Sequence, residues 1–118
     1  MKVGIDIVAI DRIKNIYKKF GYKFLHKIFT ERELEEFKGI ENFNRKIEKI
    51  SGRFAAKEAV MKTDENLTEF KKIEILSSSK GIPIVANLNG YEISISHEKD
   101  YAVAVAVLMQ LQGSKFQL

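Results

Sequence analysis

Three charged side chains interrupt segments of this sequence that are otherwise suited to close packing. Asp6 lies in the alternating stretch "KVGIDIV", and Glu58 and Lys62 lie in "GRFAAKEAVMK", residues 52–62. Two carboxylates and an ammonium group suit a Mg²⁺ ion that holds a phosphate ester, because Mg²⁺ prefers oxygen ligands from one or two carboxylates and from phosphate. The structural alternative is a Glu58–Lys62 helix pair, worth about 0.2–0.5 kcal/mol, with Asp6 capping the next helix.

A histidine further along the chain adds to this set. The segment "YEISISH" ends with Ser94, Ser96 and His97, whose side chains could converge with those of Asp6 and Glu58. Lys62 and His97 would then neutralise the remaining phosphate charge. Zinc fits less well, because the chain has no cysteine and its two histidines lie in unrelated segments.

Helices are expected in the first half of the chain to position these groups. Val3, Ile5 and Ile7 alternate with Gly4, Asp6 and Val8, which predicts a strand beginning near Lys2 with Asp6 on the face away from the isoleucines. Helical spacing then continues to Gly21, a candidate C-cap. Thr30 and Glu33 predict a capping box for a short helix that ends by Gly39. Asn42 or Asn44 should begin a long helix in which Gly52 admits a close neighbour.

We expect four strands in the second half of the chain. The segments "KKIEIL", "GIPIVANL", "YEISISH" and "YAVAVAVLM" fit strands, and Asn89-Gly90 predicts a hairpin turn between the second and third of them. We therefore expect one α+β domain over residues 1–118, with the helices of the first half packed on an antiparallel sheet and the long helix lying across it. The alanine face of "AVAVAV" should accept either that helix or another copy of the chain.

Charge and composition narrow the possible partners. The net charge is +4, and the basic residues gather in one segment: Arg12, Lys14, Lys18, Lys19, Lys23 and Lys27. Such a segment suits nucleic acid, an anionic membrane or an acidic protein, without choosing among them. The absence of cysteine excludes thiol catalysis and disulfides, and no apolar run approaches the roughly 20 residues of a membrane span. No secretory signal is recognisable, so a cytoplasmic location is expected.

Several segments together resemble one family. "GIDIVAIDRI" resembles the N-terminal signature of the acyl carrier protein synthases, the small bacterial 4'-phosphopantetheinyl transferases, and "GRFAAKEAVMK" is similar to their second signature. "FTERELEEF", "KGIP" and "ISISHEKDYAVAVAV" agree with the family in order and spacing, so the resemblance extends from Val3 to Val107.

The resemblance implies a function. Family members transfer phosphopantetheine from coenzyme A to a serine of acyl carrier protein and release adenosine 3',5'-bisphosphate. By motif position Asp6 and Glu58 would bind Mg²⁺, Lys62 would contact the pyrophosphate, and Arg53 and His97 would hold the nucleotide. The family also implies a homotrimer with sites between neighbouring chains, in which the alanine-faced strand would be interface. Arg12 matches a family position for carrier docking; Lys14, Lys19 and Lys23 are added from their charge and helical face alone.

The sequence departs from the family pattern in one place. A glycine-containing loop usually follows the second signature, but here Lys62 is followed by "TDENLTEFKK". Backbone contacts from that loop to phosphate are therefore not expected, and Lys71 or Lys72 could substitute for them.

Two other functions fit parts of the sequence. A small nucleic-acid-binding domain would use the basic helix, with Asp6 and Glu58 purely structural; its affinity would fall steeply with salt and ignore Mg²⁺. A non-catalytic assembly subunit would dock partners on the same basic face and would tolerate Glu58→Gln.

Overall fold

Ten elements make up the part of the chain that the computed structural model describes, residues 1–109. In chain order they are β1 (Lys2–Ala9), α1 (Ile10–Phe20), α2 (Tyr22–Ile28), α3 (Glu31–Lys38), α4 (Phe43–Met61), the 3₁₀ turn η1 (Phe70–Lys72), β2 (Ile75–Ser77), β3 (Pro83–Val85), β4 (Tyr91–His97) and β5 (Tyr101–Leu108). The expected α+β fold is confirmed. Within residues 1–109 no helix is both long and apolar enough to cross a membrane.

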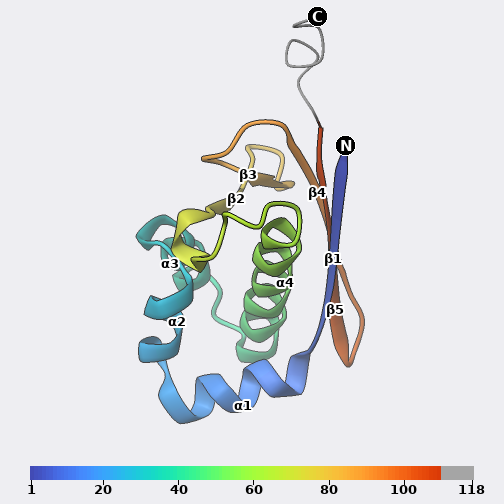
Figure 1. The fold of residues 1–118 in the computed structure, drawn as a ribbon. Helices are drawn as coiled ribbons and strands as arrows, with labels where there is room; N and C mark the ends of the chain where they lie inside the picture. The colour runs from blue at the N-terminus through green and yellow to red at the C-terminus, as the bar shows by residue number, and fades with distance from the viewer. Residues whose placement is uncertain (110–118) are drawn as a thin grey trace, which may run out of the picture.

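Helix α4 is the centre of the fold. Figure 1 shows it between the sheet on one side and α2 and α3 on the other, with α1 across one end. Close approach to the sheet depends on glycine at two points: a Cβ on Gly4 would lie 2.0 Å from the Ala59 carbonyl oxygen, and one on Gly52 would lie 2.9 Å from Ile95 Cγ2. The expected long helix across the sheet, with a close neighbour at Gly52, is therefore confirmed.

The main sheet has the antiparallel order β1-β5-β4. The alanines of β5, Ala102, Ala104 and Ala106, are buried against α4, and small side chains there let a helix lie close. The alanine face is therefore core, and the expectation that it forms an interface between copies is wrong. The opposite face of the sheet carries exposed apolar side chains, with Val3, Ile5 and Ile7 between 58% and 63% exposed.

Most predicted helix ends are confirmed. Gly21 follows α1 with φ of 57°, Thr30 and Glu33 form the capping box of α3, and Asn42 rather than Asn44 caps α4 through its side chain. Helix α2 was not expected from the sequence, because its seven residues offer no capping side chain. Its one buried side chain, Leu25, joins the core, so tertiary packing rather than local propensity stabilises it.

The strands of the second half pair differently from the prediction. Residues 70–72 form η1, so the strand expected over "KKIEIL" begins only at Ile75. Asn89-Gly90 does not close a hairpin: β3 pairs with β2 in a separate two-stranded sheet, and β4 pairs with β5. The Asn87 side chain explains the difference, since it accepts from Glu74 N and donates to the Lys72 carbonyl, which ties the segment after β3 beside β2.

Candidate functional site

Asp6 and Lys62 meet where β1 contacts the end of α4. Lys62 Nζ lies 3.2 Å from Asp6 Oδ1 and donates to the Ile5 carbonyl at 2.8 Å. The second carboxylate oxygen, Asp6 Oδ2, is buried and has no hydrogen-bond partner within residues 1–109. A buried oxygen without a partner is costly, so this atom is available to a cation.

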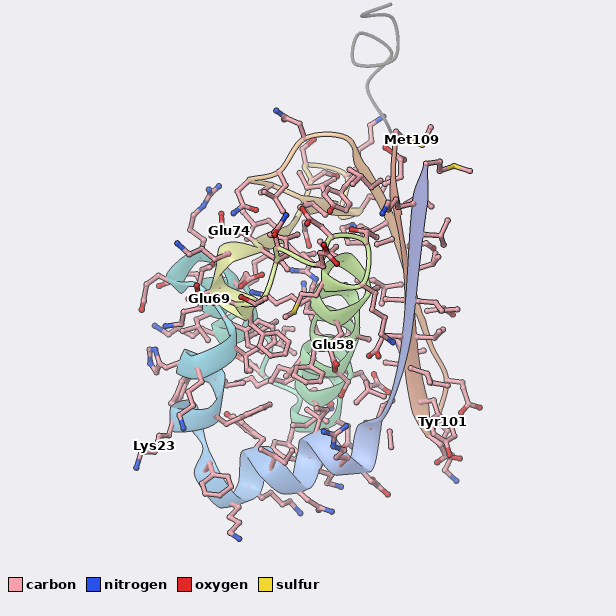
Figure 2. The ribbon with its side chains drawn as sticks, viewed as in Figure 1. Lys23, Glu58, Glu69, Glu74, Tyr101 and Met109 are labelled. Carbon is pink, nitrogen blue, oxygen red and sulfur yellow. The ribbon has the colours of Figure 1, made fainter. Side chains whose placement is uncertain are left out.

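Glu58 completes this group, which we call the carboxylate cluster (Asp6, Glu58 and Lys62). Figure 2 shows Glu58 on α4. Partial burial raises the pKa of Glu58, and the Asp6 charge raises it further, while Arg12 and Lys62 oppose the shift. The two carboxylates are therefore close enough to repel each other, which a bound cation would relieve.

Two carboxylates are the protein ligands that the cluster offers to a metal ion. No group of three or more histidine, cysteine, aspartate or glutamate side chains is placed to hold a metal in the described part of the chain. Mg²⁺ commonly takes one or two carboxylates and completes its shell with water and substrate phosphate. Asp6 and Glu58 supply such a pair, and the partnerless Asp6 Oδ2 fits this use.

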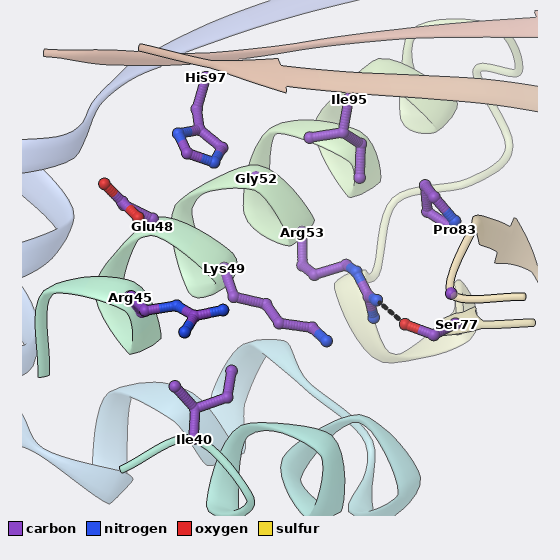
Figure 3. A pocket seen from close by; sticks show the side chains of 11 residues that line it. Ile40, Arg45, Glu48, Lys49, Gly52, Arg53, Ser77, Pro83, Ile95 and His97 are labelled. Atoms are coloured by element: carbon purple, nitrogen blue, oxygen red, sulfur yellow. Dashed lines mark hydrogen bonds between the residues drawn. The ribbon is translucent and has the colours of Figure 1, made fainter. Parts of the chain in front are cut away.

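A second set of candidates lines a cavity on the other side of α4. The cavity has a volume of about 390 Å³, and Arg53 and His97 line it together, next to Gly52. Arg45 and Lys49 also line it, and Figure 3 shows all four side chains around one space. We call this the cationic cavity. Arg45 and Lys49 were missed in the sequence, although their helical spacing to Arg53, at i, i+4 and i+8, was a signal that could have found them.

The guanidinium of Arg53 is largely occupied by the protein. It donates to the Ile75 carbonyl at 2.6 Å, to Ser77 Oγ at 2.8 Å and to Glu36 Oε1 at 3.1 Å, and the residue is 4% exposed. Lys49 Nζ lies 3.5 Å from the same Glu36 oxygen. Arg45 forms no salt bridge within residues 1–109, so it is the less constrained cation of the cavity.

The carboxylate cluster and the cationic cavity lie at opposite edges of the sheet. On the face toward α4, Asp6 is aligned with Ala104 and Ile95, and Val8 with Ala102 and His97. Two strand spacings, about 10 Å, therefore separate the strand of Asp6 from that of His97, and α4 packs over the strand between them. One chain does not bring His97 to the carboxylates.

Ser94 and Ser96 are also not where the sequence suggested. They alternate with Ile93 and Ile95, pair with Val105 and Val103, and are exposed on the face of the sheet away from α4. The expected convergence of these serines with Asp6 and Glu58 is wrong, because neighbouring residues of a strand point to opposite faces.

The predicted basic surface lies on α1 and α2. Arg12, Lys19 and Lys23 are exposed and Lys14 is partly buried. Lys23 and Lys27 line a groove of about 350 Å³ together with the apolar residues Ile16, Phe20 and Phe24. Since the charge of Arg12 influences Glu58, this surface begins beside the carboxylate cluster.

The segment after Lys62 folds back without glycine. Thr63 is buried and its hydroxyl contacts the Val60 carbonyl at 2.6 Å and Tyr91 OH at 2.7 Å. The segment borders an open hollow of about 480 Å³ that Lys2 and Lys62 also line. Lys71 and Lys72, suggested as substitutes for a glycine loop, lie on η1 and line neither this hollow nor the cationic cavity.

Comparison with known proteins finds the same family by sequence and by fold. Residues 2–106 match the family model described as the 4'-phosphopantetheinyl transferase superfamily. A holo-[acyl-carrier-protein] synthase of Natranaerobius thermophilus is 43% identical over 90% of this chain and 94% of its own, and one of Thermodesulfovibrio yellowstonii is 46% identical over 90% and 96%.

Solved structures agree with this match. A holo-(acyl-carrier-protein) synthase of Bacillus anthracis, in complex with CoA (3',5'-ADP), is similar with a TM-score of 0.78 and 36% identity, over 91% of this chain and 94% of the other. The Helicobacter pylori enzyme in complex with coenzyme A gives a TM-score of 0.73 and 31% identity, over 90% and 98%. The resemblance inferred from the two signatures is confirmed, and the chain belongs to the holo-[acyl carrier protein] synthases of the 4'-phosphopantetheinyl transferase superfamily.

Proposed function

We propose that this chain transfers the 4'-phosphopantetheine group of coenzyme A to a serine of apo acyl carrier protein, in a Mg²⁺-dependent reaction that releases adenosine 3',5'-bisphosphate. The observation that carries the proposal is the carboxylate cluster: Asp6 on β1 is paired with Lys62, keeps one buried oxygen without a partner within residues 1–109, and raises the pKa of Glu58 on α4. The family match supplies the reaction class.

The residues of the cluster have separate tasks in this proposal. Asp6 and Glu58 would hold Mg²⁺, which when bound would supply positive charge beside the pyrophosphate. The serine oxygen forms a bond to the β-phosphorus, and the bond from that phosphorus to the bridging oxygen breaks, so the leaving nucleotide keeps the bridging oxygen as part of its 5'-phosphate. Lys62, 54% exposed at its side chain, can turn from Asp6 toward the phosphate oxygens on which charge develops.

A base must accept the serine proton, and Glu58 is our candidate. Burial and the Asp6 charge raise the pKa of Glu58 while the metal is absent, and a bound cation would lower it again, so Glu58 is assigned by its place in the cluster and not by its basicity. The proton would pass to its carboxylate directly or through a water molecule. Glu58 therefore serves both in binding and in proton transfer.

The nucleotide portion of coenzyme A fits the cationic cavity. Arg53 and His97 were assigned to it by motif position, and Arg45 and Lys49 add two cations that the fold places there. A phosphate group entering the cavity would meet the side chain of Arg45 without first breaking an ion pair, because none of the salt bridges within residues 1–109 involves it. Phosphate binding by several cations is favourable when their charges are not already neutralised.

A homotrimer explains how the two halves of the site could meet. The carboxylate cluster lies at the β1 edge and His97 at the β4 edge of the same sheet, so a head-to-tail ring would set one chain's cluster beside a neighbour's cationic cavity. The exposed Val3, Ile5 and Ile7 supply an apolar face for such packing. We propose that each site is formed between two copies.

Acyl carrier protein would dock on the basic surface of α1 and α2. Arg12, Lys14, Lys19 and Lys23 would attract an acidic partner, and the apolar groove at Phe20 and Phe24 would take apolar side chains from it. We propose this partner in preference to nucleic acid or a membrane, because Arg12 connects the surface to Glu58.

The decisive experiment incubates the full chain with coenzyme A, Mg²⁺ and apo acyl carrier protein, and measures the mass of the carrier. The proposal predicts one added phosphopantetheine group per carrier, loss of the product when EDTA is present, and its return when excess Mg²⁺ is added. A carrier of unchanged mass under all conditions would defeat the proposal. Glu58→Gln should abolish the transfer while the far-ultraviolet circular dichroism spectrum stays that of the wild type.

A further inference from the structure

Strand β2 has one edge paired with β3 and one edge that faces the helices. Along the helix-facing edge of β2 and of the residues just before it, four successive backbone groups bond to side chains instead of to a strand: the Ile73 carbonyl, the Ile75 amide, the Ile75 carbonyl and the Ser77 amide. The partners come alternately from α4 and α3. Side chains of the two helices thus replace a third strand.

The first pair of partners is Lys57 and Glu33. Lys57 Nζ lies 2.6 Å from Glu33 Oε1 and donates to the Ile73, Ile28 and Phe70 carbonyls at 2.7, 2.9 and 3.0 Å. Glu33 Oε2 accepts from the Ile75 amide at 2.7 Å. Both side chains are 0% exposed.

The second pair is Arg53 and Glu36, one turn along each helix. Arg53 donates to the Ile75 carbonyl and to Ser77 Oγ, and Glu36 accepts from the Ser77 amide at 2.9 Å. A guanidinium–carboxylate contact of 3.1 Å joins the pair. Glu33 and Glu36 are three residues apart on α3, and Arg53 and Lys57 are four residues apart on α4, so each pair lies on one helix face. Alternate residues of a strand present their backbone groups to the same edge, so two successive turns of each helix can reach two such residues.

This edge determines where one wall of the cationic cavity stands. Ser77, Gly81 and Pro83 of the β2–β3 hairpin line the cavity opposite α4, and Figure 3 shows Pro83 and the bond between Arg53 and Ser77 there. A sheet of two three-residue strands is marginal without outside support. Four helix side chains give that support at the cavity.

We propose that Lys57 and Glu33 are positioning residues that, beside the Arg53–Glu36 pair, hold the β2–β3 wall at the distance from α4 that the nucleotide of coenzyme A requires. This proposal rests on the proposed function, because the cavity is assigned to coenzyme A there. Lys57 and Glu33 are fully buried, so they cannot touch the ligand and must act through β2.

Burial of this ion pair is otherwise difficult to explain. Desolvation lowers the pKa of Lys57 while Glu33 opposes the shift, so the pair is held against a burial cost. Apolar side chains of similar size often stabilise a core as well as a buried pair does. Apolar side chains would leave the Ile73 carbonyl and the Ile75 amide at the edge of β2 without hydrogen-bond partners.

The test compares the wild type with Glu33→Met/Lys57→Met, which removes both charges together and leaves no lone buried charge. Hydrogen exchange is measured at the Ile75 and Ser77 amides, and the KM values for coenzyme A and for the carrier are measured at saturating Mg²⁺. We expect exchange at Ile75 to rise about tenfold, as for one lost hydrogen bond, and the KM for coenzyme A to rise about tenfold with kcat changed less than about threefold and the KM for the carrier unchanged.

Two further variants separate positioning from stability. Glu33→Asp keeps both charges but withdraws the carboxylate by one methylene, so it should fold and show a smaller change of the same kind. Glu35→Met/Lys38→Met removes an exposed ion pair of the same helix, 3.6 Å apart, that does not touch β2, and should change neither exchange nor KM.

An unchanged KM for coenzyme A, accompanied only by a lower unfolding midpoint, would overturn the proposal, as would unchanged exchange at Ile75. Failure of the proposed function is recognised separately, because the wild type itself would then leave the carrier unmodified. The exchange measurement needs no turnover, so it would still show whether these side chains hold β2.

Discussion

Lys62 Nζ lies 3.2 Å from Asp6 Oδ1, so the ammonium group of α4 neutralises one of the two carboxylates of the carboxylate cluster. The same ammonium is tied to the Ile5 carbonyl at 2.8 Å, and the other oxygen of Asp6 has no partner within residues 1–109. A metal bound by Asp6 would therefore either share this carboxylate with Lys62 or displace the Lys62 ammonium group from it.

Lys62→Met should bind Mg²⁺ or Mn²⁺ more tightly than the wild type when coenzyme A is absent. Lys62 is about half exposed, so the competing ion pair is worth at most about 1 kcal/mol and the gain should be about two- to fivefold. Calorimetric titration of the metal measures it. Lys2→Met, at the same hollow, is the matched control and should show no gain. Weaker binding by Lys62→Met would mean that Lys62 assists the metal.

Gly4→Ala should strongly destabilise the protein, because the new methyl group would meet the Ala59 backbone 2.0 Å away. We expect a loss of about 1–3 kcal/mol or more in the free energy of unfolding, measured by urea denaturation. Gly39→Ala is the control, since its nearest neighbour would be 3.7 Å away and its φ of −74° suits alanine. Equal stability of the two variants would show that Gly4 of β1 does not pack against the Ala59 carbonyl of α4.

Glu36 should make stability depend on acid pH. Burial by itself would raise the pKa of Glu36, but the hydrogen bond from the Ser77 amide and the charge of Arg53 outweigh it, so the pKa lies below its ordinary value of 4.5. The folded state then binds the proton less tightly than the unfolded state, and the contribution is full above pH 4.5 and is lost as the pH falls through the folded pKa. Urea denaturation from pH 6 to pH 3 should show a smaller loss in Glu36→Gln than in the wild type.

Charge reversal on the basic surface should weaken recognition of the carrier. Lys19→Glu/Lys23→Glu should raise the KM for the carrier by about tenfold at low salt, with the KM for coenzyme A unchanged, and the difference should shrink as salt is added. Steady-state kinetics at several salt concentrations measures both. Lys71→Glu/Lys72→Glu is the matched control, because η1 also carries two exposed lysines but is not part of the basic surface of α1 and α2. Equal losses in both variants would indicate a general charge effect without a docking site.

Ile5→Glu should dissociate the proposed trimer. Ile5 is 60% exposed on the outer sheet face, where a carboxylate costs a single chain little but cannot be buried between copies. Sedimentation should find monomers, and transfer should be lost because the site is shared between copies. Ile84→Glu, at a residue 44% exposed on β3, is the control and should leave the assembly intact. A wild type that is monomeric and active would contradict the shared site.

Local sequence determined much of this protein. Alternation in "KVGIDIV" placed Asp6 on the face opposite the isoleucines, and the capping side chains of Thr30 and Asn42 placed two helix starts, because such signals depend on neighbouring residues only. The two signature segments were sufficient to recognise the family, which the family model confirms. The same two segments contain Asp6, Glu58 and Lys62, the residues of the carboxylate cluster.

Tertiary structure decided the strand pairing, the burial of Lys57 and the position of His97, because each depends on contacts between segments that are distant in the sequence. Asn89-Gly90 is a strong turn signal, but β3 found its partner in β2 because Asn87 bonds across to Glu74 and Lys72. The burial of Lys57 depends on Glu33 and on carbonyl groups of residues up to 29 positions away in the chain. The separation of His97 from Asp6 likewise follows from strand order, which is set by contacts between distant segments and not by the sequence of either strand.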